Sequence, residues 1–262
     1  MKIGFFDSGL GGLYLLKAVA NRLPKYDYVF LGDTKNLPYG EKSRKQIYNL
    51  TGKAIKFLFD RGCLLVIVAC NTSSSQALRK IQKEYLPTNF AGRKVLGVIR
   101  PTVELISAGD VCVLATTGTV RARAYTRELR KINPKLRVFE LPAPELVLLL
   151  ETGQLGKLKS AVAKYTGLVN DKKVKNLILG CTHYAVIKDQ FARGLGRGIK
   201  LISQDEIIPV KLADYLGRHP EIENKLSKRK DRKFYVTKLN RDFLLNAKKW
   251  FGKKISLELA RY

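Results

Sequence analysis

The sequence predicts an α/β protein of two pseudo-symmetric α/β domains, whose mostly parallel sheets face each other across a cleft. Strand-like and helix-like segments alternate along all 262 residues, which is typical of parallel sheets covered by helices. Two strand-like segments end in the apolar runs Leu64–Val68 and Leu177–Leu179, as in strands buried on both faces. A short cysteine motif follows each of these runs.

The local composition of the sequence predicts the individual strands and helices. Nine short segments rich in aliphatic and aromatic residues are predicted strands: Lys2–Phe6, Tyr28–Leu31, Leu64–Ala69, Val95–Val98, Val111–Ala115, Leu136–Glu140, Asn176–Leu179, Ile199–Ile202 and Phe234–Thr237. Helices follow most of them. One begins near Gly12, one spans Ser43 to Asp60 with Ser43 as its N-cap, and one covers the region 121–131.

The two halves of the chain show a weak internal duplication. Each opens with a strand, a loop rich in small and polar residues, and a helix; the loops begin at Asp7 and Thr116. Cys70 lies 63 positions after Asp7, and Cys181 lies 65 positions after Thr116. Two similar units related by a pseudo-two-fold axis would direct both thiols at one ligand.

The charge is strongly basic, because 49 Lys and Arg residues outnumber 22 Asp and Glu residues and give a net charge of +27. Six of the basic residues lie within 225–233. Nucleic-acid binding is one interpretation of such a charge. Aromatic residues do not alternate with the basic cluster, so a solvated basic surface is the favoured interpretation.

Neither a membrane span nor a secretion signal is predicted. No apolar stretch approaches the roughly 20 residues that cross a bilayer. The first strand starts at once, without the pattern of a signal peptide. We therefore expect a cytoplasmic protein.

The four cysteines do not indicate a metal site or a disulfide framework. None forms a C-x-x-C pair, and His183 and His219 are the only histidines, so no bound metal is expected. Cys63 and Cys112 precede or lie within apolar strands and are predicted to be buried core residues.

Cys70 and Cys181 are the candidate reactive groups. Both follow buried strands, and ligands in open α/β sheets bind beyond the carboxyl ends of the strands. Two thiols on opposite faces of a stereocentre can remove a proton on one side and return one on the other, which is racemisation or epimerisation. Asp7 and His183 are candidates to set the protonation of the thiols. Uncharged donors for an anionic substrate are available at Ser8, Asn71, Thr72, Thr116, Thr119 and Thr182.

Each feature taken singly is more often a packed cysteine or a capped turn, but together they match a family. The motifs are Asp7-Ser8-Gly9-x-Gly11-Gly12, Gly32-Asp33-Thr34-x-Asn36-x-Pro38-Tyr39-Gly40, Ala69-Cys70-Asn71-Thr72 and Gly180-Cys181-Thr182-His183-Tyr184. Their order and spacing resemble those of bacterial glutamate racemase, within the aspartate/glutamate racemase superfamily, along essentially the whole chain.

The resemblance implies two domains, residues 1–97 with 208–262 and residues 98–207, with the active site in the cleft between them. It implies cofactor-independent interconversion of L- and D-glutamate, which supplies D-glutamate for peptidoglycan, by a homodimeric enzyme. Cys70 would act on the D-enantiomer and Cys181 on the L-enantiomer, assisted by Asp7, His183 and Glu151. Substrate-contacting positions would be Ser8, Pro38, Tyr39, Gly40, Asn71, Thr72, Thr116, Thr119 and Thr182.

Several residues depart from those common in the family: Arg100, Ala122, Ala143, Glu145, Leu148, Ala185 and Ser203-Gln204. None of these departures removes a proton-transfer group. Two alternatives stay open from the sequence: a racemase for aspartate or a broader set of amino acids, and a basic nucleic-acid-binding or regulatory protein on the same fold.

Overall fold

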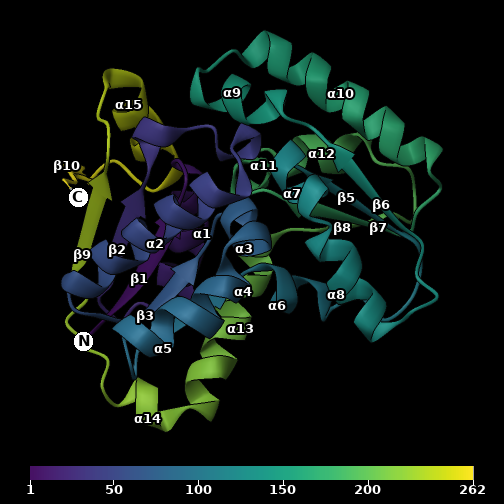
Figure 1. Cartoon of the computed structure of the whole chain (residues 1–262). Coiled ribbons are helices and arrows are strands. Elements are labelled where there is room, and N and C mark those ends of the chain that lie inside the picture. Colours follow the sequence, from purple (N-terminus) through teal and green to yellow (C-terminus); the bar gives the residue numbers. More distant parts are fainter. Residues whose placement is uncertain (262) are drawn as a thin grey trace.

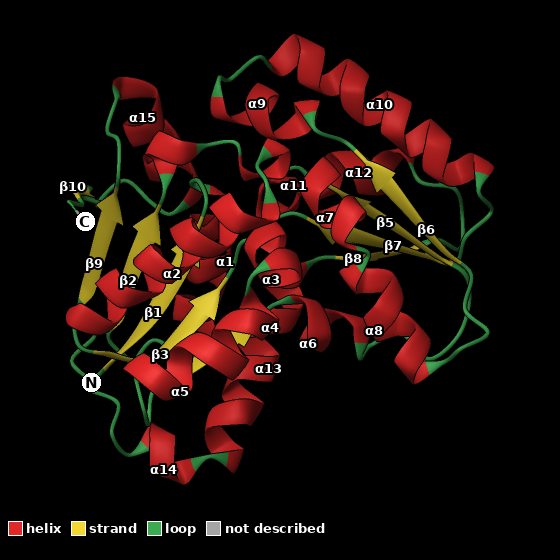
Figure 2. Ribbon diagram, in the orientation of Figure 1, coloured by secondary structure: helices red, strands yellow, loops and turns green. Residues whose placement is uncertain are grey.

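The computed structural model describes residues 1–261 and contains two parallel sheets (Figures 1 and 2). The six-stranded sheet has the order β10-β9-β2-β1-β3-β4, and the four-stranded sheet has the order β6-β5-β7-β8. Every paired strand is parallel to its neighbour. The predicted α/β class with parallel sheets is confirmed.

The strands of the first sheet come from both ends of the chain. They are β1 (Lys2–Asp7), β2 (Tyr28–Gly32), β3 (Cys63–Val68), β4 (Lys94–Gly97), β9 (Arg232–Val236) and β10 (Glu258–Leu259). The second sheet is built from consecutive strands, namely β5 (Val111–Ala115), β6 (Val138–Pro142), β7 (Asn176–Gly180) and β8 (Lys200–Ile202).

The two sheets share one internal order. Four strands of the first sheet lie side by side in the order β2-β1-β3-β4, and the second sheet has the order β6-β5-β7-β8. If the strands of each set are numbered by their order in the chain, both sets have the spatial order 2-1-3-4. By this correspondence the ends of β1 and β5, at Asp7 and Thr116, are equivalent, as are the ends of β3 and β7 before the two cysteines. The topology agrees with the duplication expected from spacing.

Helices cover both faces of each sheet. The longer helices are α1 (Gly11–Arg22), α2 (Arg44–Asp60), α8 (Ala124–Ile132), α10 (Leu155–Asp171), α13 (Gln204–Arg218) and α15 (Arg241–Trp250). The shorter ones are α3 (Asn71–Gln76), α4 (Leu78–Lys80), α5 (Leu86–Asn89), α6 (Ile99–Val103), α7 (Thr117–Ala122), α9 (Glu145–Glu151), α11 (Thr182–Ala185), α12 (Lys188–Gly194) and α14 (Pro220–Glu223). Two 3-10 turns, η1 (Thr34–Asn36) and η2 (Tyr39–Glu41), and a π-helical turn, η3 (Ile81–Tyr85), complete the described elements.

Alternation along β1 separates two apolar clusters. Ile3 and Phe5 join the cluster beneath α1 and α13, whereas Phe6 joins the cluster beneath α2. The first cluster continues into the second sheet through Cys112 and Leu177, so one apolar core connects the two halves. Figure 1 shows α1, α3 and α11 between the two sheets.

Two local predictions from the sequence, the helix cap at Ser43 and the burial of two cysteines, are confirmed. Ser43 caps α2: its hydroxyl accepts from the Gln46 N–H, and the Gln46 side chain accepts in return from the Ser43 N–H. Cys63 and Cys112 are fully buried, and burial raises the pKa of each thiol to about 12. Both are inert core residues.

The helix expected over 121–131 is instead two helices. α7 ends at Ala122 and α8 begins at Ala124, because Arg123 has a left-handed backbone with φ of 49° that breaks the helical hydrogen-bond ladder. The strand expected over Leu136–Glu140 runs instead from Val138 to Pro142, and β10 was not predicted. None of the helices in residues 1–261 is long and apolar enough to cross a bilayer.

Candidate active site

The two motif cysteines occupy equivalent strand ends. Cys70 follows β3 and caps the N-terminus of α3, and Cys181 follows β7 immediately before α11. Both side chains are buried. Their loops come from different sheets, and hydrogen bonds of neighbouring motif residues join the two loops.

Asp7, the last residue of β1, makes that contact. Its carboxylate accepts backbone N–H groups of Gly12 at 2.9 Å and Gly9 at 3.4 Å, within its own loop. It also accepts the hydroxyl of Thr182, at 3.3 Å from each carboxylate oxygen. Burial raises the pKa of Asp7, although the nearby His183 acts in the opposite direction. One buried acid thus joins the Cys70 side to the Cys181 side.

Cys70 forms hydrogen bonds only with uncharged polar groups among the described residues. Its thiol donates to the Ser8 hydroxyl at 3.3 Å, and its sulfur accepts the Ser73 N–H at 3.5 Å. Burial raises the pKa of the Cys70 thiol, and the charge of Asp7 raises it further. The protonated thiol is therefore the favoured state at this position.

Cys181 lies beside a histidine and carboxylate pair. Its sulfur is 3.8 Å from Nδ1 of His183, and Nε2 of the same ring is 2.6 Å from Oε1 of Glu151. Burial alone would lower the pKa of His183, but its hydrogen bonds to Cys181 and Glu151 outweigh burial and raise it well above 6.5. An imidazolium next to Cys181 stabilises negative charge on that sulfur.

Glu151 is held from several directions. Its Oε1 also accepts the Leu10 N–H at 3.2 Å, and its backbone carbonyl accepts the Asn246 amide at 3.0 Å. The Trp250 ring lies edge-to-face with His183, with ring centroids 5.8 Å apart. The second carboxylate oxygen, Oε2, is buried and has no hydrogen-bond partner within residues 1–261. Only the family resemblance selected Glu151 as a site residue, and in the structure its carboxylate bonds His183 of the Cys181 motif.

Gly11 allows the two loops to approach. A Cβ atom at this position would lie 2.7 Å from Nδ1 of His183, 2.7 Å from the Thr182 hydroxyl and 2.8 Å from the His183 backbone nitrogen. Real Cβ atoms do not come so close, so only glycine fits between α1 and α11 here.

A Gly11→Ala substitution should therefore separate the loops. We expect it to lower the free energy of unfolding by about 1–3 kcal/mol, as overpacking does, and to displace His183 from Cys181. Thermal or urea unfolding checks the first effect. Gly156→Ala, at an exposed position of α10 where a Cβ has open space, is the control and should not destabilise the protein. An unchanged unfolding free energy for Gly11→Ala would contradict the interpretation.

The remaining predicted contact residues form two groups near these loops. The hydroxyls of Thr72, Thr116 and Thr119 lie 2.9–3.3 Å from one another, which joins α3 of the first sheet to α7 of the second. The Pro38–Gly40 segment reaches the same loops, since a Cβ at Gly40 would lie 3.1 Å from Thr116.

Buried Asp33 anchors the Pro38–Gly40 segment. Its carboxylate accepts the Tyr39 hydroxyl at 2.6 Å and the Thr237 hydroxyl at 2.7 Å. Thr237 follows β9, so the C-terminal part of the chain supports this segment. Asp33 belongs to the second sequence motif, and its anchoring role is visible only in the folded protein.

Asn71 contacts two residues that sequence reasoning did not select. Gln204 exchanges two amide hydrogen bonds with Asn71, at 2.9 and 3.0 Å, and the Tyr125 hydroxyl donates to Asn71 at 2.7 Å. Gln204 follows β8, at the same edge of the second sheet as Cys181, and that position was the available signal. Tyr125 carries no sequence signal of this kind.

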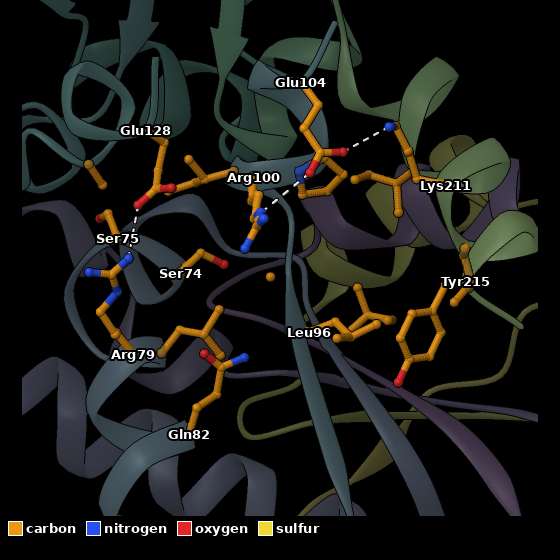
Figure 3. Close-up of a pocket in the computed structure, with 18 of the residues that line it drawn as sticks. Ser74, Ser75, Arg79, Gln82, Leu96, Arg100, Glu104, Glu128, Lys211 and Tyr215 are labelled. Carbon is orange, nitrogen blue, oxygen red and sulfur yellow. Dashed lines mark hydrogen bonds and ion pairs between the residues drawn. The ribbon is translucent and has the colours of Figure 1, made fainter. Parts of the chain in front are cut away.

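A cavity of about 440 Å³ is lined by residues of several helices (Figure 3). α3 and α4 contribute Ser74, Ser75 and Arg79, whereas α6 and α13 contribute Arg100 and Lys211. Neither Cys70 nor Cys181 lines it. Arg100, one of the departures from the family pattern, is exposed here and pairs with Glu104.

Comparison with known proteins decides the family. No family model matches the chain. The chain is 38% identical over 239 residues to the glutamate racemase of Jannaschia sp. (strain CCS1), with 85% of this chain and 87% of that protein covered. The chain belongs to the glutamate racemase family. It is also 37% identical over 238 residues to the glutamate racemase of Dinoroseobacter shibae, covering 85% and 86% of the two chains.

Solved structures of the family have the same architecture. Glutamate racemase from Francisella tularensis in complex with D-glutamate matches with a TM-score of 0.88 and 31% identity, covering 99% of this chain and 97% of that one. An aspartate racemase from Picrophilus torridus matches with a TM-score of 0.55 at 22% identity, which shows a shared fold only. Within the described residues, no group of three or more His, Cys, Asp or Glu side chains is arranged to hold a metal ion.

Proposed function

We propose that this chain interconverts L- and D-glutamate by moving protons between Cα and the thiols of Cys70 and Cys181. The observation that carries the proposal is the placement of both cysteines at equivalent ends of two equivalent sheets, joined through the Asp7–Thr182 hydrogen bond. Family membership supports glutamate as the substrate, since the relatives are named for it and one has D-glutamate bound.

In the L to D direction, the Cys181 thiolate takes the Cα proton and becomes a thiol. The electron pair of the broken C–H bond moves into the substrate carboxylate, and Cys70 then gives its thiol proton to the opposite face of Cα. Cys70 ends as the thiolate, which is the base for the reverse direction. Protons and charge balance, and no co-reactant is required.

The unequal environments of the thiols support this assignment. The raised pKa of Cys70 favours a thiol ready to donate, and the raised pKa of His183 places a positive charge beside Cys181. The free enzyme is therefore poised to accept L-glutamate. Glu151 holds the histidine, and the charge of Asp7 raises the pKa of Cys70.

Uncharged residues would surround the two substrate carboxylates and bind them mainly through hydroxyl, amide and backbone N–H donors. The proposed contacts are Ser8, Pro38, Tyr39, Gly40, Asn71, Thr72, Thr116, Thr119 and Thr182. Most of these residues are buried around the two cysteine loops. Hydroxyl, amide and backbone donors suit an anion without fixing a positive charge near the reacting carbon.

We also propose domains of residues 1–97 with 208–262 and of residues 98–207. The pairing of β9 and β10 with the first sheet supports the return of the C-terminal segment to the first domain. The second boundary falls within α13, which packs on α1. A role in peptidoglycan supply, a homodimeric state and a cytoplasmic location stay predictions, and nucleic-acid binding is not favoured.

Deuterium incorporation tests the proposed reaction. In D2O without added pyridoxal phosphate, each enantiomer of glutamate should acquire one deuterium at Cα as it converts to the other. Proton NMR follows the label, and chiral chromatography follows the inversion. L-Aspartate is the control for substrate class and should give a far lower kcat/KM. Inversion that retains the original Cα proton, or a preference for aspartate, would contradict the proposal.

A further inference from the structure

The amide of Asn71, directly after Cys70, lies in a buried hydrogen-bond network. Its Oδ1 accepts the Tyr125 hydroxyl at 2.7 Å and Nε2 of Gln204 at 3.0 Å, and its Nδ2 donates to Oε1 of Gln204 at 2.9 Å. Nε2 of Gln204 also approaches the hydroxyls of Tyr125, at 3.0 Å, and Thr102, at 3.4 Å. All four side chains are buried.

Thr102 determines the direction of every bond in this network. Its hydroxyl proton is donated to the Val98 carbonyl at 2.6 Å, so the hydroxyl oxygen can only accept from Gln204. The Gln204 atom nearest to Thr102 must therefore be the nitrogen, and its oxygen must face Asn71. Asn71 then has to present its nitrogen to that oxygen and its own oxygen to Tyr125.

The network also ties together elements that come from both sheets. Asn71 follows β3 of the first sheet, Tyr125 lies on α8 after β5 of the second, and Gln204 begins α13 after β8. Thr102 lies on α6, where the chain first passes from one sheet to the other. The orientation of one amide beside Cys70 is thus set by residues that only the assembled protein brings together.

We propose that Gln204, Tyr125 and Thr102 are positioning residues that hold the Asn71 amide with its second N–H directed at the substrate. The inference rests on the proposed function, because the substrate is the group this donor would bind. An amide nitrogen has two N–H groups, and Gln204 takes one of them. A reversed amide would present an oxygen to an anionic substrate and weaken binding.

Gln204→Glu is the decisive variant, because it keeps the shape and replaces the nitrogen by an ionisable oxygen. An ionised carboxylate cannot donate to Asn71 Oδ1, Tyr125 or Thr102, and it repels Asn71 Oδ1. We expect KM for glutamate to rise at least 10-fold at pH 8, with kcat within about 3-fold of wild type. A protonated carboxyl donates again, so the ratio of variant to wild-type KM should fall toward 1 as the pH is lowered to 6.

Burial brings this titration into the measurable range, since desolvation raises the pKa of a carboxyl. A merely structural defect would not recover as the pH falls. Gln154→Glu is the matched control: the same chemical change at an exposed position outside the network should leave the KM ratio at 1 throughout.

Tyr125→Phe gives a second measurement with the ring packing retained. It removes one donor to Asn71 and should raise KM about 3- to 10-fold. Because Tyr125 and Gln204 act on the same amide, the double variant should raise KM no more than Gln204→Glu alone. Such non-additive effects are expected of residues in one hydrogen-bond network.

A KM ratio of 1 for Gln204→Glu at every pH, or additive effects in the double variant, would overturn the inference. So would a fall in kcat and melting temperature at constant KM. These results leave the proposed function intact as long as the wild type racemises glutamate. A wild type that does not racemise glutamate would instead refute the proposed function.

Discussion

Replacing Cys70 or Cys181 by alanine should lower kcat/KM for glutamate racemisation by about 10³-fold or more. Each cysteine is proposed as the only acid or base on its face of the substrate, and a positioned proton-transfer group contributes typically 10²–10⁴-fold. The two enantiomers have equal free energy, so kcat/KM must fall equally in both directions. A coupled or polarimetric assay measures both.

Each single variant should keep one half of the chemistry. Cys70→Ala retains the Cys181 base, so it should exchange the Cα proton of L-glutamate with D2O without inverting it. Cys181→Ala should do the same for D-glutamate alone. Exchange of both enantiomers by one variant, or retained racemisation, would contradict the two-base assignment.

Cys112→Ala is the matched control for these variants. Cys112 is fully buried in a strand of the second sheet and has no part in the proposed chemistry. Its removal should destabilise the protein through a small cavity and leave kcat/KM within about 3-fold of wild type. Comparison of the three variants therefore separates loss of a thiol from loss of a proton carrier.

Glu151→Gln should lower kcat/KM about 10²-fold near pH 7 and should partly recover at higher pH. The carboxylate accepts from His183 at 2.6 Å and is one cause of its raised pKa. Without that charge, burial lowers the pKa of His183, the ring loses its proton, and the Cys181 thiolate loses its positive neighbour. The acidic limb of the pH–rate profile should therefore move to higher pH.

The control for Glu151→Gln is Glu145→Gln on the same helix. Glu145 accepts from Tyr165 at 2.6 Å and from Lys164 at 3.4 Å, and it has no hydrogen bond to His183. Its profile should match that of the wild type. An acidic limb that does not move in Glu151→Gln would show that Glu151 does not set the protonation of His183.

Local pattern was sufficient for much of the fold. Apolar runs such as Leu64–Val68 predicted buried parallel strands, because a strand covered on both faces must be apolar at every position. The α2 cap at Ser43 was equally predictable from the sequence, since its partner Gln46 is three residues away. Both properties depend on neighbours in the sequence.

The placement of the motifs was also predictable. Asp7, Cys70 and Cys181 each end or follow a strand, and parallel strands in one sheet end at the same edge. The sequence alone therefore located the candidate site at the strand ends, and the residue types suggested proton transfer. It could not show which side chains touch.

Tertiary structure alone decided those contacts. The Glu151 carboxylate on α9 bonds both the His183 ring and the Leu10 N–H. Gln204 bonds Asn71, 133 positions away in the chain, and Arg232 of β9 pairs with Tyr28 of β2. Such bonds join residues distant in the chain, so no local periodicity records them. The sequence by itself determined most of the strands, the Ser43 cap and the two cysteines at strand ends. The assembly of the two halves determined the burial that raises the pKa of Cys70, the hydrogen bonds that raise the pKa of His183, and the orientation of Asn71, because burial and long-range hydrogen bonds exist only in the folded protein.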